Sequence, residues 1–132
     1  MTLSREEQEK EELRKYYSCP NYIYFIENYN RILDYFTPKR ISHHFSLSKL
    51  KYGDLIKFRN LSCCYLFTDN TYNVLYIGST KDFFHRLLIH KHRKDKLTKA
   101  TFVITIQSEN NLKEEKLAIE HFQPKYNIRL RN

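Results

Sequence analysis

The chain has 132 residues, the size of one domain with room for a short appendage. Hydrophobic residues make up 41% and charged residues 29%, which is enough apolar material for one compact core. Lys and Arg outnumber Asp and Glu by 23 to 15, and the formal net charge is +8. This excess suits a polyanionic partner such as nucleic acid, or else belongs to a solvated basic surface.

The cysteine pattern and the N-terminus bear on the cellular compartment. Cys19, Cys63 and Cys64 contain no CxxC spacing, and two of them are adjacent. We therefore expect neither a disulfide framework nor a structural zinc site, and free thiols favour a reducing compartment. No apolar run approaches the roughly 18 residues of a membrane span, and the N-terminus is charged. We expect an intracellular protein that is neither secreted nor membrane-spanning.

The first half of the chain is predicted to be helical. The predicted helices cover residues 4–17, 22–36 and 46–58. Ser4 and Glu7 form a capping-box pattern, and Pro38 ends the second helix, whose first five residues also fit a strand. Gly53 weakens the third helix. We expect residues 1–60 to be an N-terminal helical extension, either packing on the rest or serving as an interaction or dimerisation arm.

Stronger signals follow in the second half. We predict strands at 63–68, 73–77 and 101–106, and helices from just after position 82 to about 92 and from 112 to about 122. Gly78 is expected to break the second strand, Ser79 and Asp82 to cap the first helix, and Asn111 with Glu114 to cap the second. The order predicts an α+β domain over residues 61–132, with a small, mostly antiparallel three-stranded sheet flanked by helices.

A polar stripe is predicted on the helix after Gly78. Asp82, Arg86 and His90 recur every four residues and share one face of that helix. The stripe is either part of a functional site near Tyr76 or an ordinary solvent-exposed face of a basic helix.

A carboxylate interrupts the apolar stripe of the last helix. Leu112, Ile119 and Phe122 recur at helical spacing, and Glu115 lies within the stripe. An ionised carboxylate on a core-facing stripe costs several kcal/mol unless it is paired or bound to a cation. Glu115 is therefore predicted either to form an ion pair, with Arg86 as the candidate, or to bind a metal ion.

Together these residues resemble the GIY-YIG nuclease family, over residues 63 to about 130. The matching positions are Tyr65, Tyr76-Ile77-Gly78, Arg86, His90, Glu115 and Asn127. The segment EKLAIEHFQPKYNI, from Glu115 to residue 128, resembles the end of this domain in excision-repair nuclease subunits and structure-specific endonucleases. The first motif departs from the family, because Cys63 and Cys64 stand where the family has Gly-Ile.

The resemblance implies a metal-dependent endonuclease acting on DNA, with RNA as the alternative substrate. It implies that Glu115 holds one Mg²⁺ or Mn²⁺ ion and that Arg86 binds the phosphate. Tyr65 and Tyr76 would flank the attacking water, one of them as general base. His90 would orient a tyrosine or contact the phosphate.

Two further residues are expected to support such a site. Gly78 would end its strand tightly, so that the chain turns and presents Tyr76 and Arg86 to one phosphate. Asn127 would tie the C-terminal tail to the site by hydrogen bonds.

Basic residues supply the candidate nucleic-acid contacts. These are Lys81, Lys91, Arg93 and Lys94, the last three within a basic loop at 90–99 that is otherwise simply solvated. The segment 49–59 is expected to pack on the core, or alternatively to grip nucleic acid. The competing function is a nucleic-acid-binding module of the same fold without turnover, although a pure binder has no need for a carboxylate at position 115.

Overall fold

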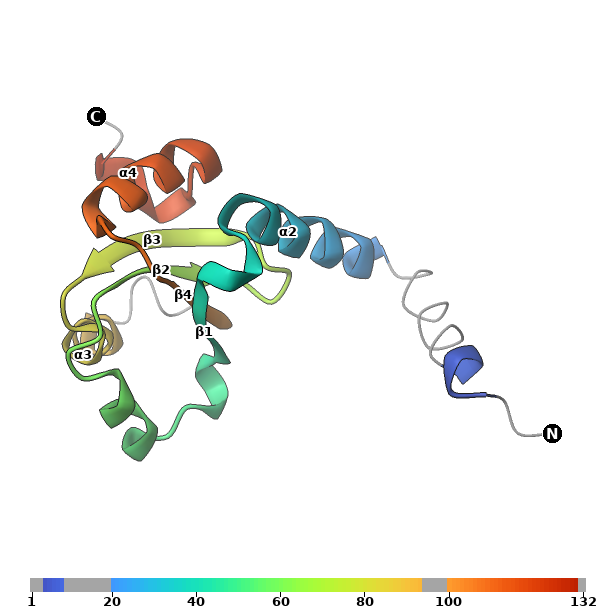
Figure 1. Cartoon of the computed structure of the whole chain (residues 1–132), viewed down its shortest axis with the longest axis horizontal. Helices are drawn as coiled ribbons and strands as arrows, with labels where there is room; N and C mark the ends of the chain where they lie inside the picture. The colour runs from blue at the N-terminus through green and yellow to red at the C-terminus, as the bar shows by residue number, and fades with distance from the viewer. Residues whose placement is uncertain (1–3, 9–19, 94–99, 131–132) are drawn as a thin grey trace.

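A four-stranded antiparallel sheet forms the centre of the computed structural model, which describes residues 4–8, 20–93 and 100–130 (Figure 1). The strands are β1 (Ile41–Ser46), β2 (Cys63–Thr68), β3 (Val74–Thr80) and β4 (Phe102–Ile106), in the spatial order β1-β4-β2-β3. The expected α+β architecture is confirmed. The expectation of three strands is wrong, because β1 adds a fourth strand at one edge.

Strand β1 was not recognisable from its own residues. The segment ISHHFS has neither a clear apolar alternation nor a β-branched run. It pairs antiparallel with β4, where Phe45 lies opposite Val103 and His44 opposite Ile104. Pairing with the β-branched strand β4 therefore overrides a weak local preference.

Strand β2 is the central element of the core. All six of its residues are buried, because helices cover both faces of the sheet. Cys63 packs in the cluster on one face and Cys64 in the cluster on the other, as expected for neighbours on a strand. Burial raises the pKa of the Cys63 thiol to about 12 and also raises that of Cys64. Both cysteines are thus protonated core residues rather than reactive thiols.

Two helices cover one face of the sheet and a third covers part of the other (Figure 1). Their bounds are α2 Pro20–Phe36, α3 Phe83–Arg93 and α4 Asn111–Phe122. Helices α2 and α4 bury Ile32, Phe36, Ala118 and Ile119 against one face. Helix α3 buries Leu87 with other side chains against the opposite face. Residues 22–26, which by sequence also fitted a strand, are helical.

The predicted helix at 46–58 consists instead of two short 3-10 helices, η2 (Leu47–Lys49) and η3 (Tyr52–Phe58). Leu50 and Lys51 are extended between them, which breaks the helical path. Leu55 and Phe58 are nonetheless buried in the same cluster as Tyr65. Side chains of β1, α2 and η3 thus share hydrophobic clusters with residues that follow position 60.

The remaining described elements are two short 3-10 turns and one helical turn near the N-terminus. The turns are η1 (Pro38–Arg40) and η4 (Lys125–Leu130). Residues 5–8 are helical, and the Ser4 hydroxyl accepts the backbone N–H of Glu7 at 3.2 Å. The rest of the helix predicted over 4–17 lies outside the described residues. Among the described helices, none has the length and apolar character needed to cross a membrane.

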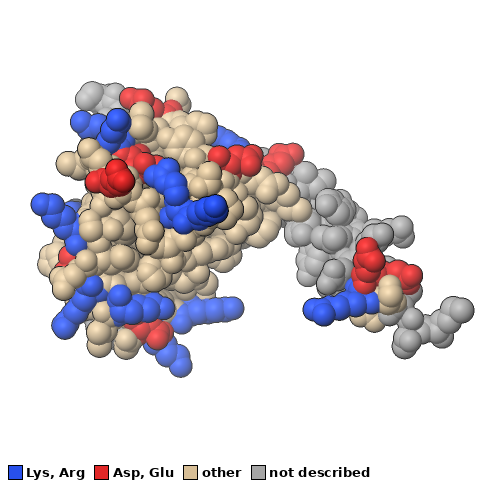
Figure 2. All heavy atoms as spheres, viewed as in Figure 1, with Lys and Arg blue, Asp and Glu red and all other residues tan. Residues whose placement is uncertain are grey.

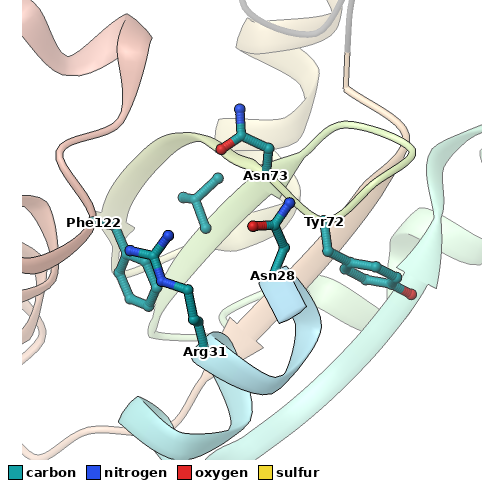
Figure 3. A pocket seen from close by; sticks show the side chains of 6 residues that line it. Asn28, Arg31, Tyr72, Asn73 and Phe122 are labelled. Atoms are coloured by element: carbon teal, nitrogen blue, oxygen red, sulfur yellow. The ribbon is translucent and has the colours of Figure 1, made fainter. Parts of the chain in front are cut away.

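A small cavity lies where α2 meets the β2–β3 turn (Figure 3). It is lined by Asn28, Arg31, Tyr72, Asn73, Val74 and Phe122. Its volume of about 20 Å³ is room for about one water molecule. The Asn28 side-chain amide donates to the Thr71 carbonyl at 3.0 Å, so this region anchors α2 to the turn.

Candidate active site

Gly78 lies within β3 and does not end it, contrary to expectation. The strand continues to Thr80, and Gly78 pairs with Tyr65 across the β2–β3 ladder. A Cβ atom at position 78 would overlap the Tyr65 hydroxyl and would lie 2.5 Å from Cζ of its ring. The glycine is therefore required by the close approach of a phenol ring, and not by a turn.

The Tyr65 hydroxyl lies in a cluster of aromatic side chains. Tyr65 is 1% exposed, and its hydroxyl hydrogen-bonds Nε2 of His90 at 3.0 Å. The ring centroid of Tyr76 is 6.1 Å from that of Tyr65 and 5.4 Å from that of His90. Tyr76 is half-buried and His90 is buried. Tyr65, Tyr76 and His90 are at least eleven residues apart in the sequence. They thus meet on the α3 face of the sheet.

Charged side chains on two helices affect the pKa of the Tyr65 hydroxyl. Burial raises the pKa of Tyr65 strongly, and Tyr76 and Glu115 raise it further, whereas Arg86 lowers it. A hydrogen bond with Tyr76 also raises the pKa of Tyr65. At neutral pH, Tyr65 is a neutral phenol.

Glu115 is half-buried and lies on the opposite face of the sheet from Tyr65. Its Oε2 accepts a 2.5 Å hydrogen bond from the Ser79 hydroxyl. Ser79 follows Gly78, so adjacent residues of β3 contact Tyr65 on one face and Glu115 on the other. The predicted ion pair with Arg86 does not form, and the hydroxyl of Ser79 satisfies this carboxylate oxygen instead.

The apolar stripe that was expected to bury Glu115 is shorter than predicted. Leu112 is 67% exposed, whereas Ala118 and Ile119 are buried. The first turn of α4 therefore projects beyond the hydrophobic core, and Glu115 lies at its boundary. Glu115 is therefore less buried than its spacing predicted, although it contacts β3 directly through Ser79.

Arg86 borders a cleft beside this part of β3. The cleft has a volume of about 650 Å³ and is lined by Ser62, Ser79, Thr80, Lys81, Asp82, His85, Arg86, Glu109, Asn110, Asn111 and Leu112. Arg86 is exposed, and no described carboxylate lies within ion-pair distance of it. The cleft thus presents an available guanidinium next to Ser79, the residue that holds the Glu115 carboxylate.

The start of α3 is capped largely as predicted. Asp82 Oδ1 accepts the backbone N–H of His85 at 3.5 Å and that of Asn60 at 3.1 Å. The Thr80 hydroxyl accepts the backbone N–H of Asp82. Ser79 takes no part in this cap, because its hydroxyl is bound to Glu115. Asp82 also fastens the end of η3 to α3.

Asn127 joins the C-terminal turn η4 to the strand that carries Tyr76 and Gly78. It is 1% exposed, and its side-chain oxygen accepts the backbone N–H of Ile77 at 2.8 Å. Its side-chain nitrogen donates to the Ile77 carbonyl, also at 2.8 Å. The amide thus takes the place of a neighbouring strand at the edge of the sheet and fixes the backbone between Tyr76 and Gly78.

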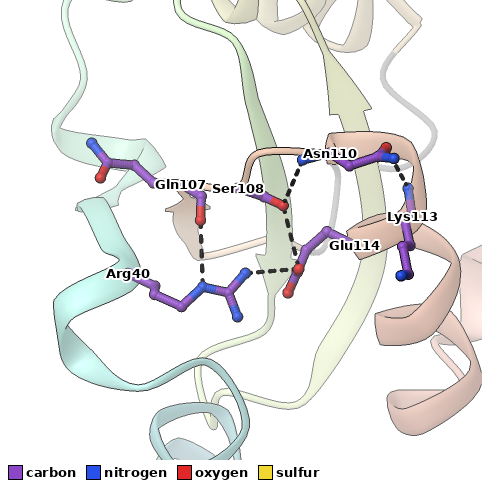
Figure 4. A network of polar contacts seen from close by, with 6 residues as sticks. All are labelled: Arg40, Gln107, Ser108, Asn110, Lys113 and Glu114. Carbon is purple, nitrogen blue, oxygen red and sulfur yellow. Dashed lines mark hydrogen bonds and ion pairs between the residues drawn. The ribbon is translucent and has the colours of Figure 1, made fainter.

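Glu114, the neighbour of Glu115, belongs to a separate polar network (Figure 4). Its carboxylate forms an ion pair with Arg40 at 2.7 Å and accepts from the Ser108 hydroxyl at 3.4 Å. Helix α4 is capped by Asn110, whose side chain accepts the backbone N–H of Lys113, rather than by Asn111. Glu114 therefore links α4 to η1 and has a structural role.

The predicted nucleic-acid contacts are only partly covered by the structure. Lys81 is exposed at the cleft. Lys91 and Arg93 lie in α3, where only their backbone is described, and Lys94 lies outside the described residues. Lys and Arg side chains are spread over the visible face, and several gather along its lower edge (Figure 2).

Sequence reasoning missed Ser79 as the partner of Glu115. The alternation of β3 offered a signal, since Ser79 must face away from Gly78 and toward the side of the last helix. Sequence reasoning also placed His90 and Arg86 together on one polar stripe of the helix, whereas His90 is buried and Arg86 is exposed.

The comparisons with known proteins add no assignment. No family model matches the chain, and no protein of curated function matches it significantly. Within the described residues, no group of three or more His, Cys, Asp and Glu side chains is placed to hold a metal ion.

Proposed function

We propose that this protein is an endonuclease of the GIY-YIG type that hydrolyses phosphodiester bonds in DNA with Mg²⁺ or Mn²⁺. The observation that carries the proposal is the grouping around adjacent residues of β3: Gly78 packs under Tyr65, which lies beside Tyr76, and Ser79 bonds Glu115. Arg86 borders the cleft that Ser79 lines. Apart from Ser79, these are the residues through which the sequence resembles that family, and they come from separate segments of the chain.

The residues fit a magnesium ion better than a metal bound by a full set of protein ligands. Mg²⁺ keeps several waters and commonly uses one or two carboxylates together with substrate phosphates. Glu115 supplies one carboxylate, which is bonded to Ser79 at the edge of a cleft of about 650 Å³. A zinc site needs three or four protein ligands, and no such group exists among the described residues. Glu115 would hold the ion, which when bound would stabilise negative charge on the phosphate.

The protein's own groups divide the remaining work. The exposed Arg86 guanidinium would form paired hydrogen bonds with two phosphate oxygens. Tyr76 is the more accessible phenol, and we assign it as the group that accepts the proton from the attacking water. Tyr65 lies beside Tyr76 and would stabilise the phenolate by donating a hydrogen bond to it, while His90 fixes Tyr65. Tyr65 and His90 are thus positioning residues.

The test is cleavage of a supercoiled plasmid with Mg²⁺ or Mn²⁺. We expect nicking or linearisation that EDTA abolishes and that Glu115→Gln lowers by at least about 100-fold, because the metal ligand is lost. Glu114→Gln is the matched control, since it changes the neighbouring carboxylate, which pairs with Arg40. Equal loss in both variants, or EDTA-resistant cutting, would contradict the proposal.

A nucleic-acid-binding module without turnover is the second candidate. It is favoured by the nearly complete burial of Tyr65 and by the engagement of Glu115 with Ser79. A panel of single-stranded, duplex, flap and branched DNA, with RNA controls, separates the two functions. Binding without cleavage on every substrate and with both metals would establish the module.

A homodimer or protein partner on residues 1–60 is also proposed. It is tested by light scattering on the full chain.

A further inference from the structure

The segment formed by η2 and η3 presents a strip of exposed cations that the proposed chemistry does not use. The exposed cations are Lys49, Lys51, Lys57 and Arg59. Figure 2 shows Lys and Arg groups along the lower edge of the molecule, where Figure 1 places this segment. We call these four side chains the basic strip.

Within the part of the chain that the structure describes, the basic strip has no carboxylate partner. The acidic residue between its members, Asp54, accepts the backbone N–H of Lys51 at 3.1 Å and so caps η3. No described carboxylate forms an ion pair with any of the four cations. A solvated surface for solubility alone would normally mix both signs.

The opposite face of the same segment is fixed to the core. Leu55 is 3% exposed and Phe58 is 0% exposed. The Phe58 ring contacts the Phe83 ring at 5.4 Å, and the Phe83 backbone N–H donates to the Leu61 carbonyl at 2.9 Å. The backbone that carries the basic strip is thus held in place by the core. Binding a ligand would therefore cost less conformational entropy than it would for a flexible segment.

The basic strip leads directly into the cleft beside β3. The Arg59 guanidinium lies over the Phe84 ring of α3 at 5.3 Å, and Asn60 is held by Asp82. Ser62 lines the cleft, together with Lys81. Exposed cations therefore lie both on the η2–η3 segment and at the cleft, where Lys81 and Arg86 occur together with Asp82 and Glu109.

We propose that the basic strip binds the sugar-phosphate backbone of the nucleic acid on one side of the cleft. Several exposed cations on a segment that adjoins a cleft with an exposed arginine fit an extended polyanion. A membrane surface fits less well, because it would need several exposed apolar side chains to insert. Among the described residues of this segment, a single large apolar side chain, that of Ile56, is exposed. This inference deepens the proposed function, and it concerns binding rather than the chemical step.

The test measures binding without metal or cleavage. Anisotropy of labelled duplex and single-stranded DNA is followed in EDTA over a salt series. The variant carries Lys49→Gln, Lys51→Gln, Lys57→Gln and Arg59→Gln together. We expect weaker binding and a salt slope for duplex that is shallower by about 0.9 for each lost phosphate contact. Far-UV circular dichroism and thermal melting check that the variant is folded.

The control removes the same number of exposed charges elsewhere. Its substitutions are Lys39→Gln, Lys113→Gln, Lys116→Gln and Lys125→Gln. It should keep most of the affinity and the wild-type slope. An equal loss in both variants would show a net-charge effect only and would overturn the proposal, as would no loss in the first.

Two further arms separate this inference from others. Stronger binding to phosphatidylserine-containing vesicles than to nucleic acid, lost in the first variant, would assign the strip to a membrane and overturn the proposal. DNA binding through the strip without any cleavage would sink the nuclease proposal and leave this one standing.

Discussion

Tyr65 and Gly78 face each other across the β2–β3 ladder, and the Tyr65 ring occupies the space that a side chain at position 78 would need. The tyrosine of the first motif and the glycine of the second are therefore one packing unit. The same strand presents Tyr76 on the face of Tyr65 and Ser79 on the face of Glu115. Changes at position 78 are thus expected to disturb all of these contacts.

Gly78→Ala is expected to destabilise the fold by about 1–3 kcal/mol, the usual cost of overpacking a buried site. The Tyr65 ring is held by His90 and cannot move aside freely. Urea unfolding measures the loss. The control is Gly53→Ala, because a Cβ there meets nothing within 4 Å and the glycine has no positive φ. Wild-type stability in Gly78→Ala would contradict the packing account.

Asn127→Asp tests the amide that closes the edge of β3. A carboxylate cannot donate to the Ile77 carbonyl, and we expect a loss of about 1–3 kcal/mol at neutral pH, more if the charge stays buried. Protonation restores a donor, so the folded state would bind the proton more tightly than the unfolded state. Stability relative to the wild type should then recover as the pH falls. Asn70→Asp, at an exposed turn, should show neither effect.

The sequence carried enough information for the elements that are defined locally. Strands β2 and β4 are apolar runs, and α4 has its Asn cap within one residue of the predicted position. Strand β1 was not predictable, because its residues become a strand only through pairing with β4.

The candidate site shows the same division. Helical spacing predicted that Arg86 and Glu115 come from two different helices, and both lie close to Ser79, one across the cleft and one by a hydrogen bond. Spacing could not predict the contact between Ser79 and Glu115 or the packing of the Tyr65 ring over Gly78, because each of these contacts joins segments that are distant in sequence. Leu112 was wrongly placed in the core, since the pattern does not show where a helix extends beyond the sheet.

Alkaline pH is expected to destabilise the protein. Burial raises the pKa of Tyr65, and it raises that of Cys63 to about 12. These groups stay protonated in the folded state and lose protons first in the unfolded state, at about pH 8.5–10. Their stabilising effect is complete below that range and is lost as the pH rises toward the folded pKa. Urea unfolding from pH 8 upward measures the decline, which Cys63→Ala should make shallower. An equal slope in that variant would contradict the assignment.

The two tyrosines are expected to differ in catalysis, provided that the protein cleaves DNA as proposed. Tyr76→Phe removes the proposed proton acceptor and should lower kcat/KM by about 100-fold or more. Tyr65→Phe keeps the ring over Gly78 but removes the hydrogen bond to Tyr76, so the rate should fall less and its rise with pH should move to higher pH. The pH profile of kcat/KM distinguishes the two roles, because a purely structural role of Tyr65 would lower the rate without moving the profile. If Tyr65→Phe proved the more damaging change and Tyr76→Phe kept the wild-type profile, Tyr65 would be the base and the assignment of Tyr76 would be wrong.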